Sequence, residues 1–279
     1  MDLLRLADQK DTKDMKKDIK NVELFLFDLD GTTYIGNKEI DGAFDTINYL
    51  RSIGKKICFF TNNSSRNHND YVAKINGMGL PISENEVYTS GQVTCEYILE
   101  NFKGKKVYLL GNDRLKTEFE SYGISVVDGD PDLCVIAFDT SLVYDRLYQF
   151  CKYVKNGLPY IATHPDFTCP AEDCPMPDIG AMIEMVRLTT GRNPDIIMGK
   201  PHTEAGLRMA KNAGLTVDKV AMVGDRLYTD IAFGNNCGFV SVLVLTGETD
   251  RSMLETSSVQ PDYVLEAVRD IPKAISNNN

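Results

Sequence analysis

The chain has 279 residues, of which 43% are hydrophobic and 25% charged, and its formal net charge is −10 at pH 7. This length allows a sizeable buried core and two domains. The negative charge argues against a nucleic-acid partner, because such binding draws on clustered Lys and Arg. No apolar stretch has the length needed to span a bilayer, so we expect no membrane partner.

The seven cysteines are an odd number and lie scattered, mostly within apolar runs. Reduced thiols in a cytoplasmic protein are the simplest account of them. Residues 1–20 are charged and lack the apolar segment of a secretory signal. We expect this N-terminal extension to be a solvated leader rather than a loose helix.

Stretches typical of strands and of helices alternate along the chain, which favours an α/β fold around a parallel sheet. The first part is expected to hold strands at 23–27 and 56–60 and helices at 42–53 and 67–77. The middle part is expected to hold helices near 90–101, 113–122, 143–155 and 178–190 and strands at 106–110, 124–127, 133–137 and 159–162. Short buried strands at 195–198, 219–223 and 239–244 complete the series.

Polar residues follow four of the expected strands at the point where each ends. These four segments are Asp28-Leu29-Asp30-Gly31-Thr32, Thr61-Asn62-Asn63, Gly199-Lys200-Pro201 and the run 224–230, which contains Asp225 and Asp230. Because the ends of parallel strands converge on one rim of a sheet, the four segments are able to share one pocket. Each segment alone is as readily a turn, a helix cap or a loop. The occurrence of all four in this order is what indicates a shared site.

The chemistry of these residues is complementary. A carboxylate that attacks phosphorus forms an aspartyl-phosphate, and we predict Asp28 as this nucleophile. Asp30 lies two residues further on and is predicted to protonate the leaving alcohol and then activate water. Oxygen ligands from Asp28, the Asp30 backbone and Asp225 suit Mg²⁺, which offsets the charge of an anionic substrate.

Further residues are predicted to contact the phosphoryl group. Lys200 supplies a positive charge that stabilises the transition state and keeps the nucleophile ionised. Asp230 is expected to orient Lys200 or a metal-bound water from behind. The residues expected to contact phosphate or substrate are Gly31, Thr61, Asn62, Asn63 and Lys200.

At this point the chain resembles the haloacid dehalogenase (HAD) superfamily of phosphatases over nearly its whole length. It is most similar to the NagD-like, 4-nitrophenylphosphatase-type subfamily (type IIA), on the stretches Phe60–Arg66, Tyr160–Asp166 and Met222–Asp230. That subfamily includes phosphatases of nucleotides, phosphosugars and pyridoxal phosphate. The resemblance implies Asp28 as nucleophile, Asp30 as acid and base, and both with Asp225 as the magnesium ligands. It also allows a homodimer.

Spacing supports the same domain organisation. Thr61 follows Asp28 by 33 residues, but Lys200 follows Thr61 by 139, which leaves room for an inserted α/β domain. We therefore expect a doubly wound, Rossmann-like core at 21–83 and 193–279, with a smaller cap domain at 84–192. Such a cap would cover the rim and exclude water.

Several residues of the expected cap are candidates for contacts with the substrate. By resemblance these are Thr163, His164, Asp166 and Asp178, although a plain loop role is nearly as favoured. Pyridoxal phosphatases carry a histidine where this chain has Cys169, which disfavours pyridoxal phosphate as the preferred substrate. A zinc site at His164, Cys169 and Cys174 is also disfavoured, because the spacing fits no common zinc pattern.

Two further side chains are left open by the sequence. Arg226 either adds positive charge near the phosphate or pairs with surface acids. Tyr34, in a short flap after the first segment, packs either on the substrate or on the core.

The sequence predicts a Mg²⁺-dependent phosphomonoester hydrolase that acts on a small phosphorylated metabolite, either a sugar phosphate, a nucleotide or an aryl phosphate. A phosphotransferase or phosphomutase of the same fold is one alternative, and would return the phosphoryl group to an alcohol. A non-catalytic protein that binds phosphorylated metabolites is another, and would release no inorganic phosphate.

Overall fold

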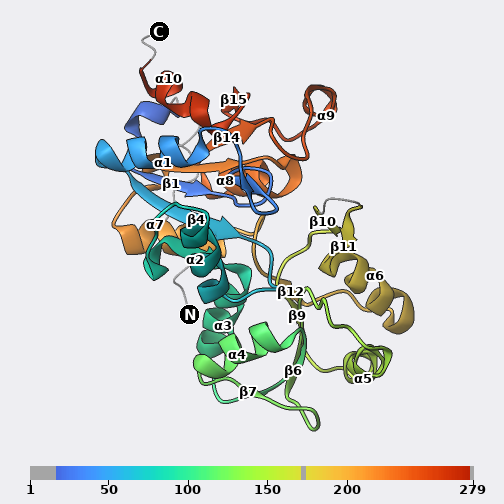
Figure 1. The fold of residues 1–279 in the computed structure, drawn as a ribbon. Helices are drawn as coiled ribbons and strands as arrows, with labels where there is room; N and C mark the ends of the chain where they lie inside the picture. Colours follow the sequence, from blue (N-terminus) through green and yellow to red (C-terminus); the bar gives the residue numbers. More distant parts are fainter. Residues whose placement is uncertain (1–16, 171–173, 277–279) are drawn as a thin grey trace, which may run out of the picture.

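A computed structural model describes residues 17–170 and 174–276 and contains two parallel β-sheets, one in each of two units (Figure 1). The larger sheet has the order β15-β14-β13-β1-β4-β5, and every neighbouring pair is parallel. Its strands are β1 (Leu24–Phe27), β4 (Lys56–Thr61), β5 (Val87–Thr89), β13 (Val220–Gly224), β14 (Val240–Val244) and β15 (Tyr263–Leu265). The predicted α/β class is confirmed.

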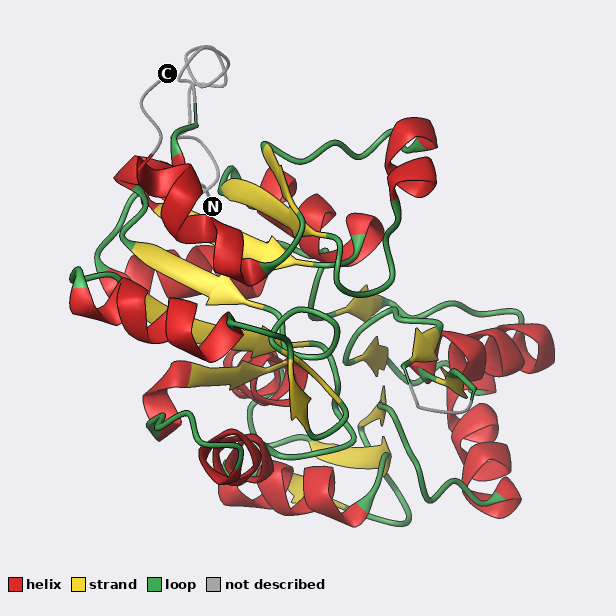
Figure 2. Ribbon diagram, turned by 45° about the horizontal axis from the view of Figure 1, so that its top comes forward, coloured by secondary structure: helices red, strands yellow, loops and turns green. Residues whose placement is uncertain are grey.

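Helices cover both faces of the larger sheet, as Figure 2 shows. Alternate side chains of β1 point to opposite faces, so Phe25 and Phe27 pack on one side and Leu24 and Leu26 on the other. The first face is covered by α1 (Ala43–Ser52), α2 (His68–Gly77) and α10 (Ile271–Ser276), and the second by α3 (Ser90–Asn101), α7 (Glu204–Ala213) and α8 (Ala232–Cys237).

The smaller unit is built around the sheet β12-β9-β8-β6-β7. Its strands are β6 (Lys106–Leu110), β7 (Ser125–Val126), β8 (Leu133–Ile136), β9 (Tyr160–Ala162) and β12 (Ile196–Ile197). One face packs on α5 (Tyr144–Lys155) and α6 (Ile179–Thr190), and the other on α3 and α4 (Asp113–Ser121). Helix α3 therefore lies between the two sheets.

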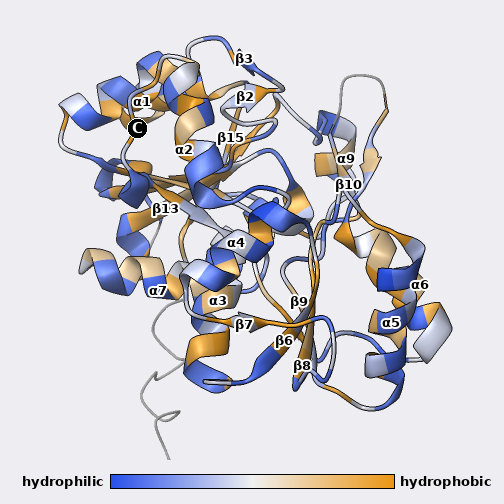
Figure 3. Ribbon diagram, turned by 60° about the horizontal axis from the view of Figure 1, so that its bottom comes forward, coloured by the Kyte–Doolittle hydropathy of each residue, from blue (hydrophilic) through white to orange (hydrophobic). Residues whose placement is uncertain are grey.

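The two units share one apolar core. A single cluster of buried side chains runs from the larger sheet through α3 and into the smaller sheet; it includes Leu26, Phe60, Val93, Leu109 and Val135. Figure 3 shows these strands as apolar ribbons between helices with hydrophilic outer faces. Because each buried aliphatic or aromatic side chain contributes about 1.5–3 kcal/mol, the shared cluster holds the units together.

Two hairpins and several short helices complete the fold. The hairpin β2 (Tyr34–Ile35) and β3 (Lys38–Glu39) forms the flap after the first segment, and β10 (Thr168–Cys169) pairs with β11 (Met176–Pro177). Tyr34 is fully buried in the core cluster of the larger unit. The short elements are η1 (Ile19–Asn21), η2 (Glu84–Glu86), η3 (Val217–Lys219), η4 (Leu227–Ile231), α9 (Arg251–Thr256) and η5 (Val268–Asp270).

Sheet membership differs from the domain limits that we expected. Val87–Thr89 pairs with β4 of the larger sheet although the cap was expected to begin at 84. Ile196–Ile197 pairs with β9 of the smaller sheet although the core was expected to resume at 193. Short strands carry weak sequence signals, and their sheet is chosen by partners far away in the chain. We propose that the cap runs from α3 to β12.

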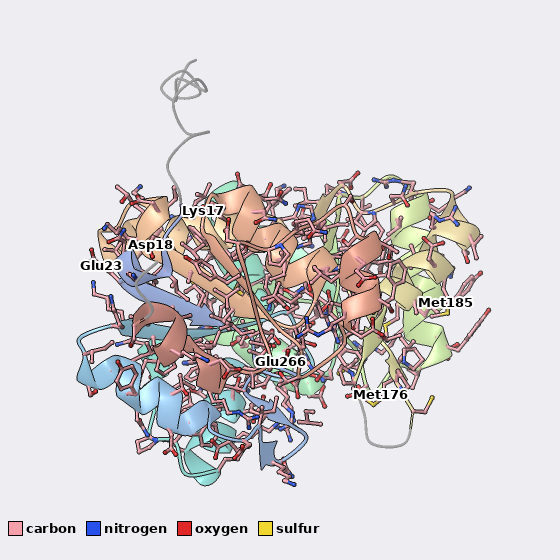
Figure 4. All side chains as sticks on the ribbon, turned by 90° about the horizontal axis from the view of Figure 1, so that it is seen from above. Lys17, Asp18, Glu23, Met176, Met185 and Glu266 are labelled. Atoms are coloured by element: carbon pink, nitrogen blue, oxygen red, sulfur yellow. The ribbon has the colours of Figure 1, made fainter. Side chains whose placement is uncertain are left out.

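The N-terminal extension was expected to be solvated, but its last residues are part of the core. Residues 1–16 lie outside the described part of the chain. Ile19 is fully buried, and Lys17 Nζ donates to the Phe239 backbone oxygen at 2.6 Å. In Figure 4, Lys17 and Asp18 lie at the opposite end of the molecule from Met176 and Met185 of the smaller unit. Within the described residues, no helix is long and apolar enough to cross a membrane.

One buried acid lies where the two units join. Glu118 of α4 is 5% exposed, and its Oε1 accepts a hydrogen bond from the backbone nitrogen of His68, at the start of α2. Its Oε2 has no hydrogen-bond partner in the structure. Burial raises the pKa of this carboxyl to about 7.

Glu118 is expected to make the protein less stable as the pH rises. The folded state holds the proton up to about pH 7, whereas the unfolded chain loses it near the ordinary value of 4.5. Between these values the folded state binds more protons, so the free energy of unfolding falls, by on the order of 3 kcal/mol in total, and then levels off. Glu118→Gln should remove this fall in urea unfolding between pH 5 and 8. Glu120→Gln, exposed on the same helix, is the control, and an unchanged pH slope in Glu118→Gln would contradict the assignment.

Candidate active site

The four segments meet at the carboxyl ends of the central strands. Asp28 follows β1, and its backbone nitrogen donates to the Val223 oxygen of β13 at 2.9 Å, which extends the sheet by one bond. Thr61 ends β4 and Gly224 ends β13, on either side of β1. Lys200 reaches the same rim from the loop that returns from the smaller unit. The expected convergence of these segments is therefore found.

Lys200 connects two of the acids. Its Nζ lies 2.5 Å from Asp28 Oδ1 and 2.7 Å from Asp230 Oδ1, and it donates to the Phe60 backbone oxygen at 3.0 Å. The side chain is almost completely buried. Burial alone would lower the pKa of the ammonium, but the carboxylates of Asp230 and Asp28 outweigh it and raise the pKa. Lys200 is thus a fixed positive charge beside Asp28.

Asp225 is held by the loop that follows β14. Its Oδ2 accepts from the Glu248 backbone nitrogen at 2.7 Å, and its Oδ1 accepts from Thr32 Oγ1 at 3.2 Å. Two glycines make room for it, because an added Cβ would lie 2.0 Å from Asp225 Oδ2 at Gly247 and 2.6 Å at Gly31. Gly31 also has a φ of +91°, a conformation that favours glycine.

Three carboxylates gather at this point. Oxygens of Asp28, Asp225 and Asp230 all lie within 4.8 Å of one another. Burial raises the pKa of Asp28 well above its usual value and, with the nearby Asp230, that of Asp225 to about 6. Close, buried carboxylates repel each other unless a cation lies between them, and hard oxygen ligands of this kind suit Mg²⁺ or Ca²⁺.

The Asp30 side chain stands apart from this cluster. Burial raises its pKa, although Lys74 and Arg66 act in the opposite direction. Asp30 lines the cavity of about 30 Å³ that Asp28 also lines, and it lines two larger cavities of about 530 and 600 Å³. A buried acid with a raised pKa, at the entrance of the site, is suited to proton transfer.

The side-chain amide of Asn62 joins the loops of Lys200 and Asp166 through hydrogen bonds. Its Oδ1 accepts from the Lys200 backbone nitrogen at 2.8 Å, and its Nδ2 donates to the Lys200 oxygen and to Asp166 Oδ1. Thr61 Oγ1 accepts from the Asn63 backbone nitrogen at 3.1 Å. Thr61, Asn62 and Asn63 all line the small cavity, together with Asp28 and Lys200.

The four cap residues expected to contact substrate fall into two pairs. Asp166 and Asp178 line the small cavity. Thr163 and His164 are fully buried and do not line it. His164 shares hydrogen bonds with Thr163 Oγ1 and Asp178 Oδ1, both at 3.1 Å, so its polar atoms are used within the smaller unit.

The disfavoured zinc site receives no support. Among the described residues, the two groups able to hold a metal are the aspartate cluster above and His164 with Asp166 and Asp178. Neither contains a cysteine. Cys169 is buried, whereas Cys174 is exposed.

Arg226 joins the two units. Its guanidinium lies 3.4 Å from Asp166 Oδ2 of the smaller unit and 3.0 Å from Glu248 Oε2 of the larger unit, and it approaches the Thr168 oxygen of the β10–β11 hairpin. Figure 1 shows this hairpin reaching from beside α6 toward the larger unit. Arg226 lines the small cavity and pairs with two acids, of which Asp166 is buried and Glu248 is exposed.

The sequence reasoning missed the segment Thr246-Gly247-Glu248. Thr246 Oγ1 donates to the Gly31 oxygen at 2.7 Å, so this segment closes over the first one. A signal was present, because the segment follows the strong strand at 240–244 and contains a glycine and polar neighbours. It follows β14, and so lies at the same rim of the larger sheet as the segments after β1, β4 and β13.

The fold is of the α/β class, and three carboxylates form the centre of the candidate site. Residues 25–125 match the family described as haloacid dehalogenase-like hydrolase, and residues 197–271 match one described as HAD-hydrolase-like.

The acid sugar phosphatase of Staphylococcus saprophyticus is 34% identical over 258 residues, which cover 92% of this chain and 99% of that one. The solved 4-nitrophenylphosphatase of Thermotoga maritima is 40% identical with a TM-score of 0.90, over 92% of this chain and 99% of the other. The glycerol phosphate phosphatase of Mycobacterium tuberculosis, solved in complex with calcium, is 26% identical with a TM-score of 0.84, over 91% and 76%.

The chain belongs to the haloacid dehalogenase superfamily, in the NagD-like group of phosphatases, and other solved structures similar to it carry the name NagD. It is a phosphatase of that superfamily.

The close approach of the Asp225 carboxylate to Gly247 is testable by substitution. In Gly247→Ala the new methyl group would overlap the Asp225 carboxylate, so that acid must move. We expect phosphatase turnover to fall by at least about 10-fold, measured as release of inorganic phosphate, since small displacements at a reacting centre are costly. Gly129→Ala, where nothing lies within 4 Å, is the matched control. Equal turnover in the two variants would show that the position of Asp225 is not critical.

Proposed function

We propose that the protein is a Mg²⁺-dependent phosphomonoester hydrolase of small phosphorylated metabolites that works through an aspartyl-phosphate at Asp28. The observation that carries this proposal is the Lys200 ammonium 2.5 Å from the Asp28 carboxylate, within a cluster of three acids. This ion pair lowers the pKa of Asp28 against the effect of burial, and so favours the ionised form that a nucleophile requires.

The aspartate cluster fits a divalent cation. We propose that Asp28 and Asp225, through their carboxylates, and Asp30, through its backbone oxygen, would hold it. Asp230 pairs with Lys200 and accepts from the Arg226 backbone nitrogen at 3.1 Å, and so supports the site from behind. When bound, the cation neutralises charge on the transferring phosphoryl group.

We propose that Asp28 and Asp30 carry out the two steps of the reaction, formation and hydrolysis of the aspartyl-phosphate. In the first, an Asp28 oxygen bonds to phosphorus and the ester bond breaks, while Asp30 donates its proton to the departing oxygen. In the second, Asp30 removes a proton from water, whose oxygen bonds to phosphorus as the Asp28–phosphorus bond breaks. The Thr61 hydroxyl and the backbone amides after it are proposed to bind the phosphoryl oxygens.

The substrates proposed are sugar phosphates and aryl phosphates, with nucleotides as a further class. The relatives named acid sugar phosphatase and 4-nitrophenylphosphatase support the first two. We expect the beta hairpins at the rim to contact the alcohol part of the ester, because Gly36 of the flap and Pro170 of the cap both line the two larger cavities.

Asp28→Asn is expected to lower the rate of phosphate release from 4-nitrophenyl phosphate by at least about 10³-fold, because an amide does not attack phosphorus. Asp30→Asn should instead trap phosphate on Asp28, seen by mass spectrometry after acid quenching, since the second step needs the base. Asp145→Asn, exposed on α5, controls for the lost charge. Near-normal turnover by Asp28→Asn would remove the covalent mechanism, and transfer of the phosphoryl group to added alcohol in preference to water would favour a phosphotransferase.

Chelation with EDTA is expected to abolish activity and added Mg²⁺ to restore it. Mg²⁺ should also raise the melting temperature of the metal-free protein, because it offsets repulsion between the buried carboxylates. The rise should be largely lost in Asp225→Asn, which retains Lys200 and the nucleophile. Turnover that persists after exhaustive chelation, or an equal rise in the variant, would count against a cation at this cluster.

A further inference from the structure

The two larger cavities beside Asp30 differ in charge. The cavity of about 530 Å³ is lined by Arg66, Lys74 and Arg114 together with the acids Asp30 and Asp113. We call it the basic cavity; its wall is completed by the flap turn at 36–37, residues 63–65, the loop at 140–141 and the β10–β11 hairpin. The cavity of about 600 Å³ has Arg226 as its single cation among the described residues, beside the acids Asp225 and Glu248.

Two of the three cations of the basic cavity have no ion-pair partner among the described residues. Within residues 17–170 and 174–276, neither Arg66 nor Lys74 forms an ion pair or a hydrogen bond. Arg114 is paired with Asp70 at 2.6 Å. In the cavity of about 600 Å³, Arg226 is paired with Asp166 and Glu248, so these two acids already neutralise its charge.

The ammonium group of Lys74 is held over an aromatic ring. Its Nζ lies 3.7 Å above the centre of the Tyr34 ring, and the ring is fully buried. Burial lowers the pKa of the half-buried ammonium. A cation that is partly desolvated and unpaired costs free energy, and a bound anion would recover it.

The position of Asp30 connects the basic cavity with the alcohol part of the substrate. Asp30 must reach the ester oxygen to protonate it, so the alcohol part of the substrate extends from Asp30 into a cavity that Asp30 lines. Arg66 and Lys74 both act electrostatically on Asp30, so they are close to the first atoms of the alcohol. The basic cavity is lined by three cations and two acids, so its balance of charge is positive even when both acids are ionised, in a protein whose net charge is −10.

We propose that the alcohol part of the preferred substrate carries a second anionic group, a carboxylate or a further phosphate, which Arg66 and Lys74 bind in the basic cavity. This inference rests on the proposed function and narrows its substrate class. The guanidinium of Arg66 matches a carboxylate or phosphate in a planar, two-pronged geometry, and Lys74 adds a point charge.

The test compares two three-carbon esters that differ mainly at one end. In 3-phosphoglycerate a carboxylate replaces the terminal hydroxymethyl group of racemic glycerol 1-phosphate. We expect the wild-type protein to prefer the carboxylate ester by about 10-fold or more in kcat/KM, since hydrogen bonds to charged groups are the stronger ones. The preference should decline as salt is added.

Arg66→Gln and Lys74→Gln should each reduce this preference several-fold, and the double variant should abolish it. The ratio is the correct readout, because both cations also act on Asp30 and a change there affects both esters alike. Lys152→Gln is the matched control, since Lys152 also lies over a tyrosine ring, that of Tyr148 on α5, outside the cavity. Its ratio should equal that of the wild type.

The inference would be overturned if the wild-type protein lacked the preference, or if the Arg66 and Lys74 variants kept it. Phosphate release from 4-nitrophenyl phosphate would in that case still support the proposed function. Release from none of the three esters would overturn both. Melting temperatures measured on every variant separate a loss of fold from a loss of charge.

Discussion

The site depends on one electrostatic constraint: three acids lie together in a buried place, and one lysine neutralises part of their charge. Lys200 touches both Asp28 and Asp230, and without it the cluster would favour protonated carboxyls. The remaining repulsion is what makes the place suitable for a cation and an anionic phosphoryl group. Everything else at the rim either holds these groups in position or controls what reaches them.

The shared apolar core explains how distant segments keep this arrangement. Helix α3 packs between the two sheets, and Lys200 lies on the strand-to-helix connection that returns from the smaller unit. Asn62 and Arg226 then bind the cap to the catalytic loops through Asp166. Asn62 therefore joins Asp166 of the cap directly to the backbone of Lys200.

Sequence patterns predicted most of the long elements, because their apolar periodicity is strong. They missed the short strand Val87–Thr89, which joins the larger sheet, and placed Ile196–Ile197 in the core although it pairs in the smaller sheet. They also left Ile19, a core residue, in a solvated leader. The motif residues were found because each follows a strand. Thr163 and His164 were assigned from the resemblance alone, and the structure instead buries them in hydrogen bonds away from the small cavity.

The sequence by itself determined which chemistry meets at the rim, because the order of strands and of the residues that follow them is local information, and parallel strands end at one edge. Only the tertiary structure decided how the charges are paired: Arg226 with Asp166 and Glu248, and the Glu248 backbone with Asp225. Arg66 and Lys74 form no ion pair with an acid in the described part of the chain. Those pairings join residues far apart in the chain, and they depend on loop paths and burial that no local pattern encodes.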